Sequence, residues 1–225
     1  MSAADEGCGE VRVRLCLADG QRTFAEALAL RLDAEADLSV VATVAGPDAL
    51  LPTLRAHPVD VALLAVEGPR SPFLGLAEAI SAERPEIRLV ALAEAPDVPV
   101  LARAVRLGFR GWVPKDADVA TLVAAVRGVV DGGTHLPPRL LTDLLPHLLH
   151  EQEERRESER LLTVLTTRER EVLVALSAGA DRQGIADELG ISSNTVRTHT
   201  QAVLKKLGVH SSLAAVALAR RAGLC

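Results

Sequence analysis

The chain has 225 residues, which is enough for two separate hydrophobic cores. Its hydrophobic content of 48% and charged content of 24% are typical of soluble globular proteins. No stretch approaches the roughly 20 apolar residues that span a bilayer. The acidic start, MSAADEGCGE, also lacks the basic residues and apolar run of a signal peptide. We therefore expect a cytoplasmic protein without a membrane anchor.

The net charge of −5, taken over the whole chain, argues against a nucleic-acid-binding protein. The charge is unevenly distributed, however. From residue 161 onward the sequence has eight Lys and Arg against five Asp and Glu, a net charge of +3, whereas residues 1–160 carry −8. This asymmetry predicts that contact with DNA is confined to the C-terminal end.

The cysteines and histidines give no sign of a metal site. Cys8, Cys16 and Cys225 show no CxxC or Cys/His spacing, and Cys16 lies in an apolar run where a buried side chain is expected. The sequence also lacks a Gly-rich phosphate loop and a Ser/His/Asp or Cys/His arrangement in a strand-turn-helix context. We therefore expect no catalytic residues, no metal and no cofactor.

Residues 11 to 130 alternate short apolar runs with amphipathic segments. The runs that predict strands are 11–17, 38–44, 59–66, 87–93 and 110–113, and the segments that predict helices lie near 21–33, 47–57, 72–83, 97–107 and 116–131. Five strands that alternate with five helices predict a doubly wound α/β domain with a five-stranded parallel sheet. In such sheets the functional groups lie at the carboxyl ends of the strands.

This half of the chain resembles a receiver domain, the flavodoxin-like regulatory half of response regulators, over about residues 10–135. The motifs RLGFRGWVPKDAD and GGTHLPP look like the end of that domain in the NarL/FixJ group. The resemblance implies two acids after the first strand that hold Mg²⁺, an Asp after the third that accepts a phosphoryl group, a hydroxyl after the fourth and a Lys near the fifth.

Most of that set is missing here. The residues at the matching positions are Ala18, Asp19, Ala65, Ala93, Trp112 and Lys115, where Trp112 takes the place of the switch aromatic. Only one acid remains after the first strand, and an alanine at the acceptor position, Ala65, has no oxygen to phosphorylate. We therefore expect a degenerate receiver, without control by aspartyl phosphate.

Several roles remain open for this pocket. Glu67 is the nearest acid to the acceptor position, and we expect it to pair with Lys115 more readily than to accept phosphate. A plain structural role is the alternative, with Lys115 exposed at a strand end, Asp19 in a turn or helix cap and Trp112 in the core or lining the surface. The three alanines leave room for a small organic ligand or collapse into a small core. Dimerisation through a receiver without a switch is a further alternative.

Residues 136–160 predict a helical linker. Its leucines recur at helical spacing before the charged run EQEERRESER, which favours i,i+4 ion pairs: they are Leu140, Leu141, Leu144, Leu145, Leu148 and Leu149. Pro146 is expected to bend or break this helix. The leucines pack on one of the domains or on a second copy in a dimer, and a plain linker is the alternative.

The stretch from Leu165 to Leu207 predicts three consecutive short helices, because its apolar residues recur every three or four positions. Capping residues precede the helices: Thr166 or Thr167, then Asp181, then Ser192 or Ser193. The breaks fall at Gly179-Ala180 and Gly190-Ile191. Short helices around a glycine turn predict a helix-turn-helix.

The third of these helices has an apolar side and a polar side. Val196, Val203, Leu204 and Leu207 are expected to pack inward, which leaves Asn194, Arg197, Thr198, Gln201 and Lys205 on the other face. Such groups on one helix face suit the major groove of DNA, and Lys205 and Lys206 lie further along, where phosphate contact is expected. The alternative is a solvated face on an ordinary helical bundle.

The segments LTTREREVL, GADRQGIADELGIS and NTVRTHTQAVLKKLGV resemble the LuxR-type output domain of the NarL/FixJ response regulators, over about residues 165–221. The resemblance implies a four-helix domain, here residues 161–225, whose fourth helix, Ser211 to about Arg221, contributes to dimerisation. By matching motif positions it implies that Arg197, Thr198 and Gln201 read bases and that Thr195 and Lys205 contact the backbone. Gly184, where the family usually has Glu, and Ser212 depart from its pattern.

The sequence thus predicts a sequence-specific transcription regulator that binds double-stranded DNA as a homodimer and acts without phosphorylation. The alternative is an interaction protein that heterodimerises with an intact response regulator and modulates it. An enzyme finds almost no support in the residues.

Overall fold

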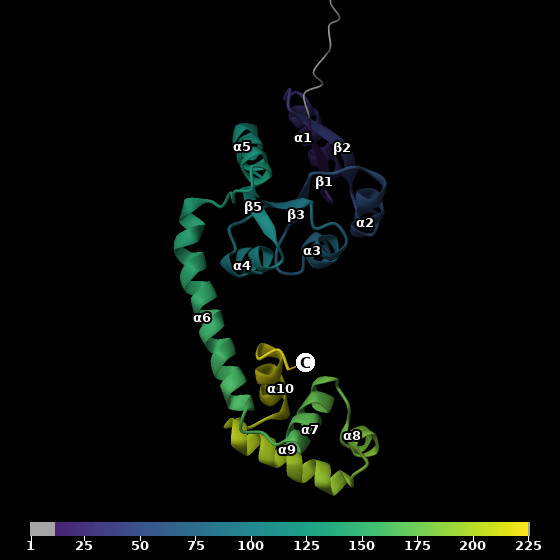
Figure 1. The fold of residues 1–225 in the computed structure, drawn as a ribbon, viewed down its shortest axis with the longest axis vertical. Helices are drawn as coiled ribbons and strands as arrows, with labels where there is room; N and C mark the ends of the chain where they lie inside the picture. The colour runs from purple at the N-terminus through teal and green to yellow at the C-terminus, as the bar shows by residue number, and fades with distance from the viewer. Residues whose placement is uncertain (1–11, 225) are drawn as a thin grey trace, which may run out of the picture. The chain divides into compact units, whose positions relative to one another are not determined.

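The computed structural model describes residues 12–224 (Figure 1), so the predictions for Cys8, Val11 and Cys225 lie outside the described residues. The chain divides into two compact units between His147 and Leu148. Each unit has its own hydrophobic core.

The first unit is a parallel sheet with helices on both faces. The strands are β1 (Val13–Ala18), β2 (Leu38–Val44), β3 (Val61–Val66), β4 (Arg88–Ala93) and β5 (Phe109–Pro114), and the helices are α1 (Arg22–Asp33), α2 (Pro47–Ala56), α3 (Pro72–Glu83), α4 (Val98–Arg106) and α5 (Val119–Val130). The strand order is β2-β1-β3-β4-β5, all parallel. The predicted doubly wound fold is confirmed, and the predicted elements differ from the observed ones only by a few residues at their ends.

Successive side chains of each strand point to opposite faces of the sheet. One core cluster joins α1 and α5 to the residues of one face, among them Leu15, Leu63 and Val90. Figure 1 shows α3 and α4 on the side of the sheet opposite to α5. Both faces of β3 are covered, since all six of its residues are buried. A central strand buried on both faces accounts for its uninterrupted apolar sequence.

The chain leaves the sheet along the edge strand β5. The Trp112 N–H donates to the His135 carbonyl at 2.8 Å, and the His135 N–H donates to the Arg110 carbonyl at 2.8 Å. These two bonds satisfy part of the outer edge of β5 and hold the segment that follows α5.

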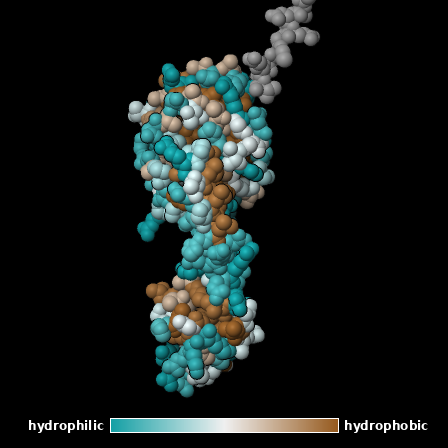
Figure 2. Space-filling view, turned by 90° about the vertical axis from the view of Figure 1, so that its left-hand side faces the viewer, coloured by the Kyte–Doolittle hydropathy of each residue, from teal (hydrophilic) through white to brown (hydrophobic). Residues whose placement is uncertain are grey.

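Helix α6 (Pro138–Leu162) continues through Pro146, so of the two predicted alternatives, a bend or a break, the break is wrong. A proline removes a single backbone hydrogen bond, and the residues on both sides stay helical. The leucine row is divided: Leu144 is buried, whereas Leu141, Leu145 and Leu149 are exposed. In Figure 2 the surface along α6 changes from brown over its leucines to teal over its charged half.

The second unit contains α7 (Thr167–Ser177), α8 (Arg182–Leu189), α9 (Ser193–Leu207) and α10 (Ser212–Arg221). Thr166 and Glu169 form a reciprocal capping box at the start of α7, and Asp181, Ser192 and Ser211 each cap the helix that follows. Helices α8 and α9 end at left-handed glycines, Gly190 with φ 64° and Gly208 with φ 68°. The predicted helix-turn-helix and fourth helix are confirmed.

Helix α9 contributes to two separate apolar clusters. Val196 packs with Val172, Ile185 and Ala186 of α7 and α8. Val203 and Leu207 pack in the other cluster, which contains residues of α7 and α10. The inward side of α9 is thereby fixed along its length, and its opposite side faces solvent.

No single helix in the described range is long and apolar enough to cross a membrane. Helices α9 and α10 pass the same test as a pair, by length and composition only, with a bend of 62° between them.

Candidate functional site

The solvent side of α9 carries the polar residues that the sequence predicts. Asn194, Arg197, Thr198, Gln201 and Lys205 are exposed, and Thr195 is half-buried. Ser192 fixes the start of the helix, because its Oγ accepts from the Thr195 N–H at 3.1 Å and lies 2.8 Å from the Thr195 hydroxyl. The first turn is therefore rigidly capped, which sets the direction of the side chains that follow.

The groups on this face are lightly held by the protein. Arg197 Nη2 donates to Asn194 Oδ1 at 3.1 Å, and the Thr198 hydroxyl donates to the Asn194 carbonyl at 3.1 Å. Lys205 and Gln201 have no hydrogen bond or ion pair with other residues of the described range. The face offers a guanidinium, two amides and an ammonium without an internal carboxylate to neutralise them, which suits contact with base edges and phosphates.

Lys206, for which phosphate contact is predicted, pairs with an acid of the protein. Its Nζ lies 2.7 Å from Glu169 Oε2, and the same oxygen accepts from the Thr166 N–H at 2.8 Å. Glu169 is 6% exposed. The bond from Lys206 and then the backbone N–H of Thr166 lower the pKa of Glu169 from its ordinary value of 4.5. Lys206 therefore ties α9 to the capping box of α7.

The carboxyl ends of the strands form a second candidate site, around Lys115 after β5. Its Nζ lies 2.9 Å from Asp19 Oδ2, 3.8 Å from Glu67 Oε1 and 3.7 Å from Glu94 Oε1. The predicted pairing of Glu67 with Lys115 is confirmed. Glu94 was not predicted, although its position directly after Ala93 at the end of β4 could have indicated it.

This cluster is largely enclosed. Asp19 is fully buried and the Lys115 side chain is 9% exposed, so the alternative of an exposed Lys115 is wrong. The ammonium also lies 5.3 Å from the centre of the Phe24 ring. Gln21 joins the acids, since its N–H donates to Asp19 Oδ1 at 2.8 Å and its Nε2 donates to Glu94 Oε1 at 2.8 Å. The hydrogen bond from the Gln21 N–H to the Asp19 side chain, two residues earlier, closes a turn, so Asp19 lies in a turn as one alternative predicts.

Comparison with known proteins places both units in one family. Residues 163–219 match the model of the family "Bacterial regulatory proteins, luxR family". The probable transcriptional regulatory protein NarL of Mycobacterium tuberculosis is 30% identical over 210 residues, which cover 93% of this chain and 94% of the relative. The chain belongs to the NarL-type response regulators. It is a transcriptional regulator with a LuxR-type DNA-binding domain, and it is not an enzyme.

Solved structures share the fold of this response regulator. The structure of two RcsB dimers bound to two parallel DNAs is 20% identical with a TM-score of 0.54, and covers 93% of this chain and 98% of that one. RcsB from Salmonella enterica serovar Typhimurium, bound to a promoter in the presence of the phosphomimetic BeF₃⁻, is also 20% identical, with a TM-score of 0.52 and the same coverage. At this level of identity the likeness concerns the fold alone.

In this response regulator the three alanines at the strand ends are part of the core. Ala18, Ala65 and Ala93 are at most 1% exposed, and Trp112 is 2% exposed. Of the two alternatives for Trp112, the core position is confirmed. The Ala65 carbonyl also accepts from the Ser71 hydroxyl at 3.0 Å, which ties the end of β3 to the start of α3.

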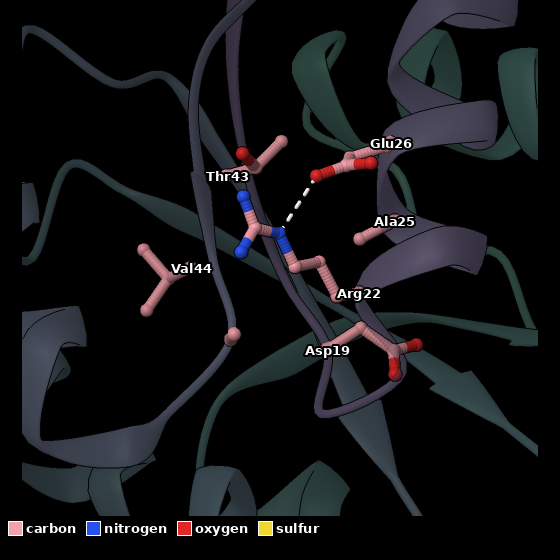
Figure 3. A pocket seen from close by; sticks show the side chains of 7 residues that line it. Asp19, Arg22, Ala25, Glu26, Thr43 and Val44 are labelled. Atoms are coloured by element: carbon pink, nitrogen blue, oxygen red, sulfur yellow. Dashed lines mark hydrogen bonds and ion pairs between the residues drawn. The ribbon is translucent and has the colours of Figure 1, made fainter.

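A hollow of about 180 Å³ lies beside Asp19, at the cluster of acids around Lys115 (Figure 3). Its lining includes Asp19, Arg22, Glu26 and Thr43, and Arg22 extends across it to donate to Glu26 Oε1 at 2.8 Å. Its alanines are Ala25 and Ala45 rather than the three at the strand ends. Pockets for small-molecule ligands are typically about 300–1,000 Å³, so this hollow is small for an organic ligand.

Proposed function

We propose that this chain is a sequence-specific regulator that reads DNA through α9 and acts in the cytoplasm without aspartyl phosphorylation. The exposed face of α9 carries the proposal for DNA. Arg197, Thr198 and Gln201 read base edges in the major groove, whereas Asn194, Thr195 and Lys205 position the helix on the strands. The absence of an internal carboxylate from this face supports the assignment.

The independence from phosphate rests on Ala65, which stands at the acceptor position implied by the resemblance. Its methyl group has no oxygen that a phosphoryl group could be transferred to, and it is 1% exposed. Lys115, the residue that would offset phosphate charge, pairs instead with Asp19 at 2.9 Å. The receiver is therefore a fixed scaffold around an internal ion pair.

The regulator acts as a homodimer on DNA. Two copies of a helix-turn-helix contact two half-sites about one helical turn apart, which requires a two-fold arrangement of the recognition helices. The resemblance assigns dimer contacts to the fourth helix, α10, and dimers are the form described for RcsB on DNA. The alternative of an interaction protein without DNA binding has less support, because α8 forms in full despite Gly184.

The test is the binding of full-length protein to its own upstream DNA, with and without a small-molecule phosphodonor and Mg²⁺. We expect the same dissociation constant in both conditions, and no phosphorylated protein by mass spectrometry. Binding that requires the donor would overturn the proposal of phosphate independence. In that event Glu67→Gln and Asp19→Asn would show which acid accepts the phosphoryl group.

A further inference from the structure

The cations of the second unit fall into two groups. Within α7–α10, most are bound by the protein itself: Lys206 to Glu169, Arg168 to Glu171, Arg221 to Glu154, and Arg170 and Arg220 to the carbonyls of Leu162 and Ser177. The remaining three, Arg182, Arg197 and Lys205, have no carboxylate partner in the described range. Arg197 and Lys205 belong to the proposed DNA-reading face of α9.

Arg182 is the one of these three that lies outside α9. It is the first residue of α8, follows the N-cap Asp181 and is exposed. Its guanidinium has no hydrogen bond or ion pair among the described residues. The Asp181 carboxylate beside it is already occupied, since its Oδ1 accepts from the Gly184 N–H at 2.7 Å.

Arg182 shares a hollow of about 390 Å³ with the DNA-reading face. The hollow lies between α8 and α9 and is lined by Arg182, Arg197, Thr200 and Gln201, with Asp181 as its only acid. Two guanidinium groups against one carboxylate give it a net charge of +1. This charge favours an anionic ligand, and a phosphate of the DNA backbone is the anion that lies beside α9 when α9 is in the major groove.

We propose that Arg182 binds a DNA phosphate beside the recognition helix, as an anchor that adds affinity without sequence preference. This inference rests on the proposed function of α9. The first helix of a helix-turn-helix crosses the backbone where the second enters the groove, so an unpartnered guanidinium at the start of α8 is placed to contact it. Arg182 thereby positions α9, and Arg197 and Gln201 read the sequence.

The test compares full-length wild type with Arg182→Gln on the operator duplex and on a duplex of scrambled sequence, over a range of salt concentrations. In the proposed homodimer the substitution removes two phosphate contacts, one from each protomer, which reduces the slope of log affinity against log salt by about 1.8. At 0.15 M salt this corresponds to roughly thirtyfold weaker binding, and we expect the same loss on both duplexes. Arg182→Lys, which keeps the charge, should retain the slope. Arg182→Ala serves as a second neutral variant if Arg182→Gln fails to fold.

Arg156→Gln is the matched control, because Arg156 is an exposed arginine of α6 without a partner in the described range. It should leave the slope unchanged. An equal loss in this control, or an unchanged slope in the neutral Arg182 variants, would overturn the role of Arg182. Wild type that binds neither duplex would instead refute the proposed function, and the phosphate contact with it.

Discussion

Arg197 and Lys205 lie on the exposed face of α9, about two turns apart, and differ in what they recognise. A guanidinium forms two parallel hydrogen bonds with a guanine edge, whereas an ammonium acts as a point charge toward phosphate. We expect Arg197→Ala to cost about 1–3 kcal/mol at one base pair and to relax selectivity there. Lys205→Ala should weaken binding to all sequences alike and lower the salt slope of the homodimer by about 1.8, about 0.9 for each protomer.

Both variants are compared by titration against a set of duplexes that differ at single positions. The control is Arg156→Gln, which removes an exposed charge of α6 and leaves the charge of α9 intact. If Arg197→Ala weakens every duplex equally, Arg197 contacts the backbone and the assignment of base reading is wrong.

Lys206 is expected to matter for stability rather than for DNA contact. Lys206→Met leaves the Glu169 carboxylate, which is 6% exposed, with only the Thr166 N–H as a partner. A buried acceptor that loses a partner costs about 1–3 kcal/mol, so we expect a loss of this size in the free energy of unfolding at pH 7. Denaturant unfolding followed by the helical circular dichroism signal measures it, with the neighbouring Lys205→Met as control.

The same pair predicts a pH dependence. Lys206 lowers the pKa of Glu169 from 4.5, so the folded state holds this proton less tightly than the unfolded state. Its contribution to stability is therefore complete above pH 4.5 and is lost as the pH falls through the lower pKa of the folded state. We expect the stability difference between wild type and Lys206→Met to shrink below pH 4.5. A difference that is constant from pH 7 to 3 would contradict the lowered pKa.

At the scale of elements, Gly184 is a weak point in the first turn of α8. Glycine in a helix costs about 0.5–1 kcal/mol relative to alanine. A Cβ at this position would lie 3.2 Å from Asp181 Oδ1, an exposed side chain that can shift by the few tenths of an ångström required. We expect Gly184→Ala to raise the free energy of unfolding, by less than about 1 kcal/mol. Differential scanning calorimetry measures the shift.

Gly190 provides the opposite control for that substitution. It ends α8 with φ 64°, in the left-handed region where a side chain is strained. Gly190→Ala should therefore lower the melting temperature while Gly184→Ala raises it. A destabilised Gly184→Ala would mean that the Asp181 cap is displaced by the new methyl group.

The elements themselves were predictable because their signals are local. Capping residues, left-handed glycines and apolar spacing lie within one turn of the helix ends that they define, and Thr166, Asp181 and Ser192 all cap as predicted or as one of the two predicted choices. The predicted break at Pro146 is wrong, since the loss of one hydrogen bond does not end a helix of 25 residues.

The missed contacts of the candidate sites join residues far apart in the sequence. Glu169 and Lys206 are 37 positions apart in the sequence. The local sequence already gives each of them another role, Glu169 in the first turn of a helix and Lys206 as a basic residue near DNA, so it does not indicate that they pair. Glu94 reaches Lys115 from another strand. Periodicity shows which face a residue occupies, but it does not specify its partner across two packed elements.

At the scale of the whole molecule, the two units differ in whether their functional cations are paired with acids of the protein. The first unit encloses Lys115 among Asp19, Glu67 and Glu94, so this lysine is paired within the protein. In the second unit Arg182, Arg197 and Lys205, on α8 and α9, have neither a carboxylate nor a backbone carbonyl as a partner in the described range. A receiver whose lysine is already paired and an output domain with available cations fit the proposal of DNA binding that is not switched by phosphate.

Substitutions in the Lys115 cluster test whether the ion pairs of the first unit affect DNA binding by the intact chain. Lys115→Met leaves fully buried Asp19 without its cation, which typically costs about 3–5 kcal/mol, whereas Glu67→Gln at a half-exposed acid should cost less than about 1 kcal/mol. Trp112 is the single tryptophan and is buried in the first unit, so its fluorescence reports that unfolding directly. Under conditions where both variants stay folded, we expect operator affinity, measured by anisotropy of a labelled duplex, to match wild type. A tenfold change in affinity for folded Lys115→Met would mean that the ion pair controls the DNA-binding unit, and the receiver would then be a switch that works without phosphate.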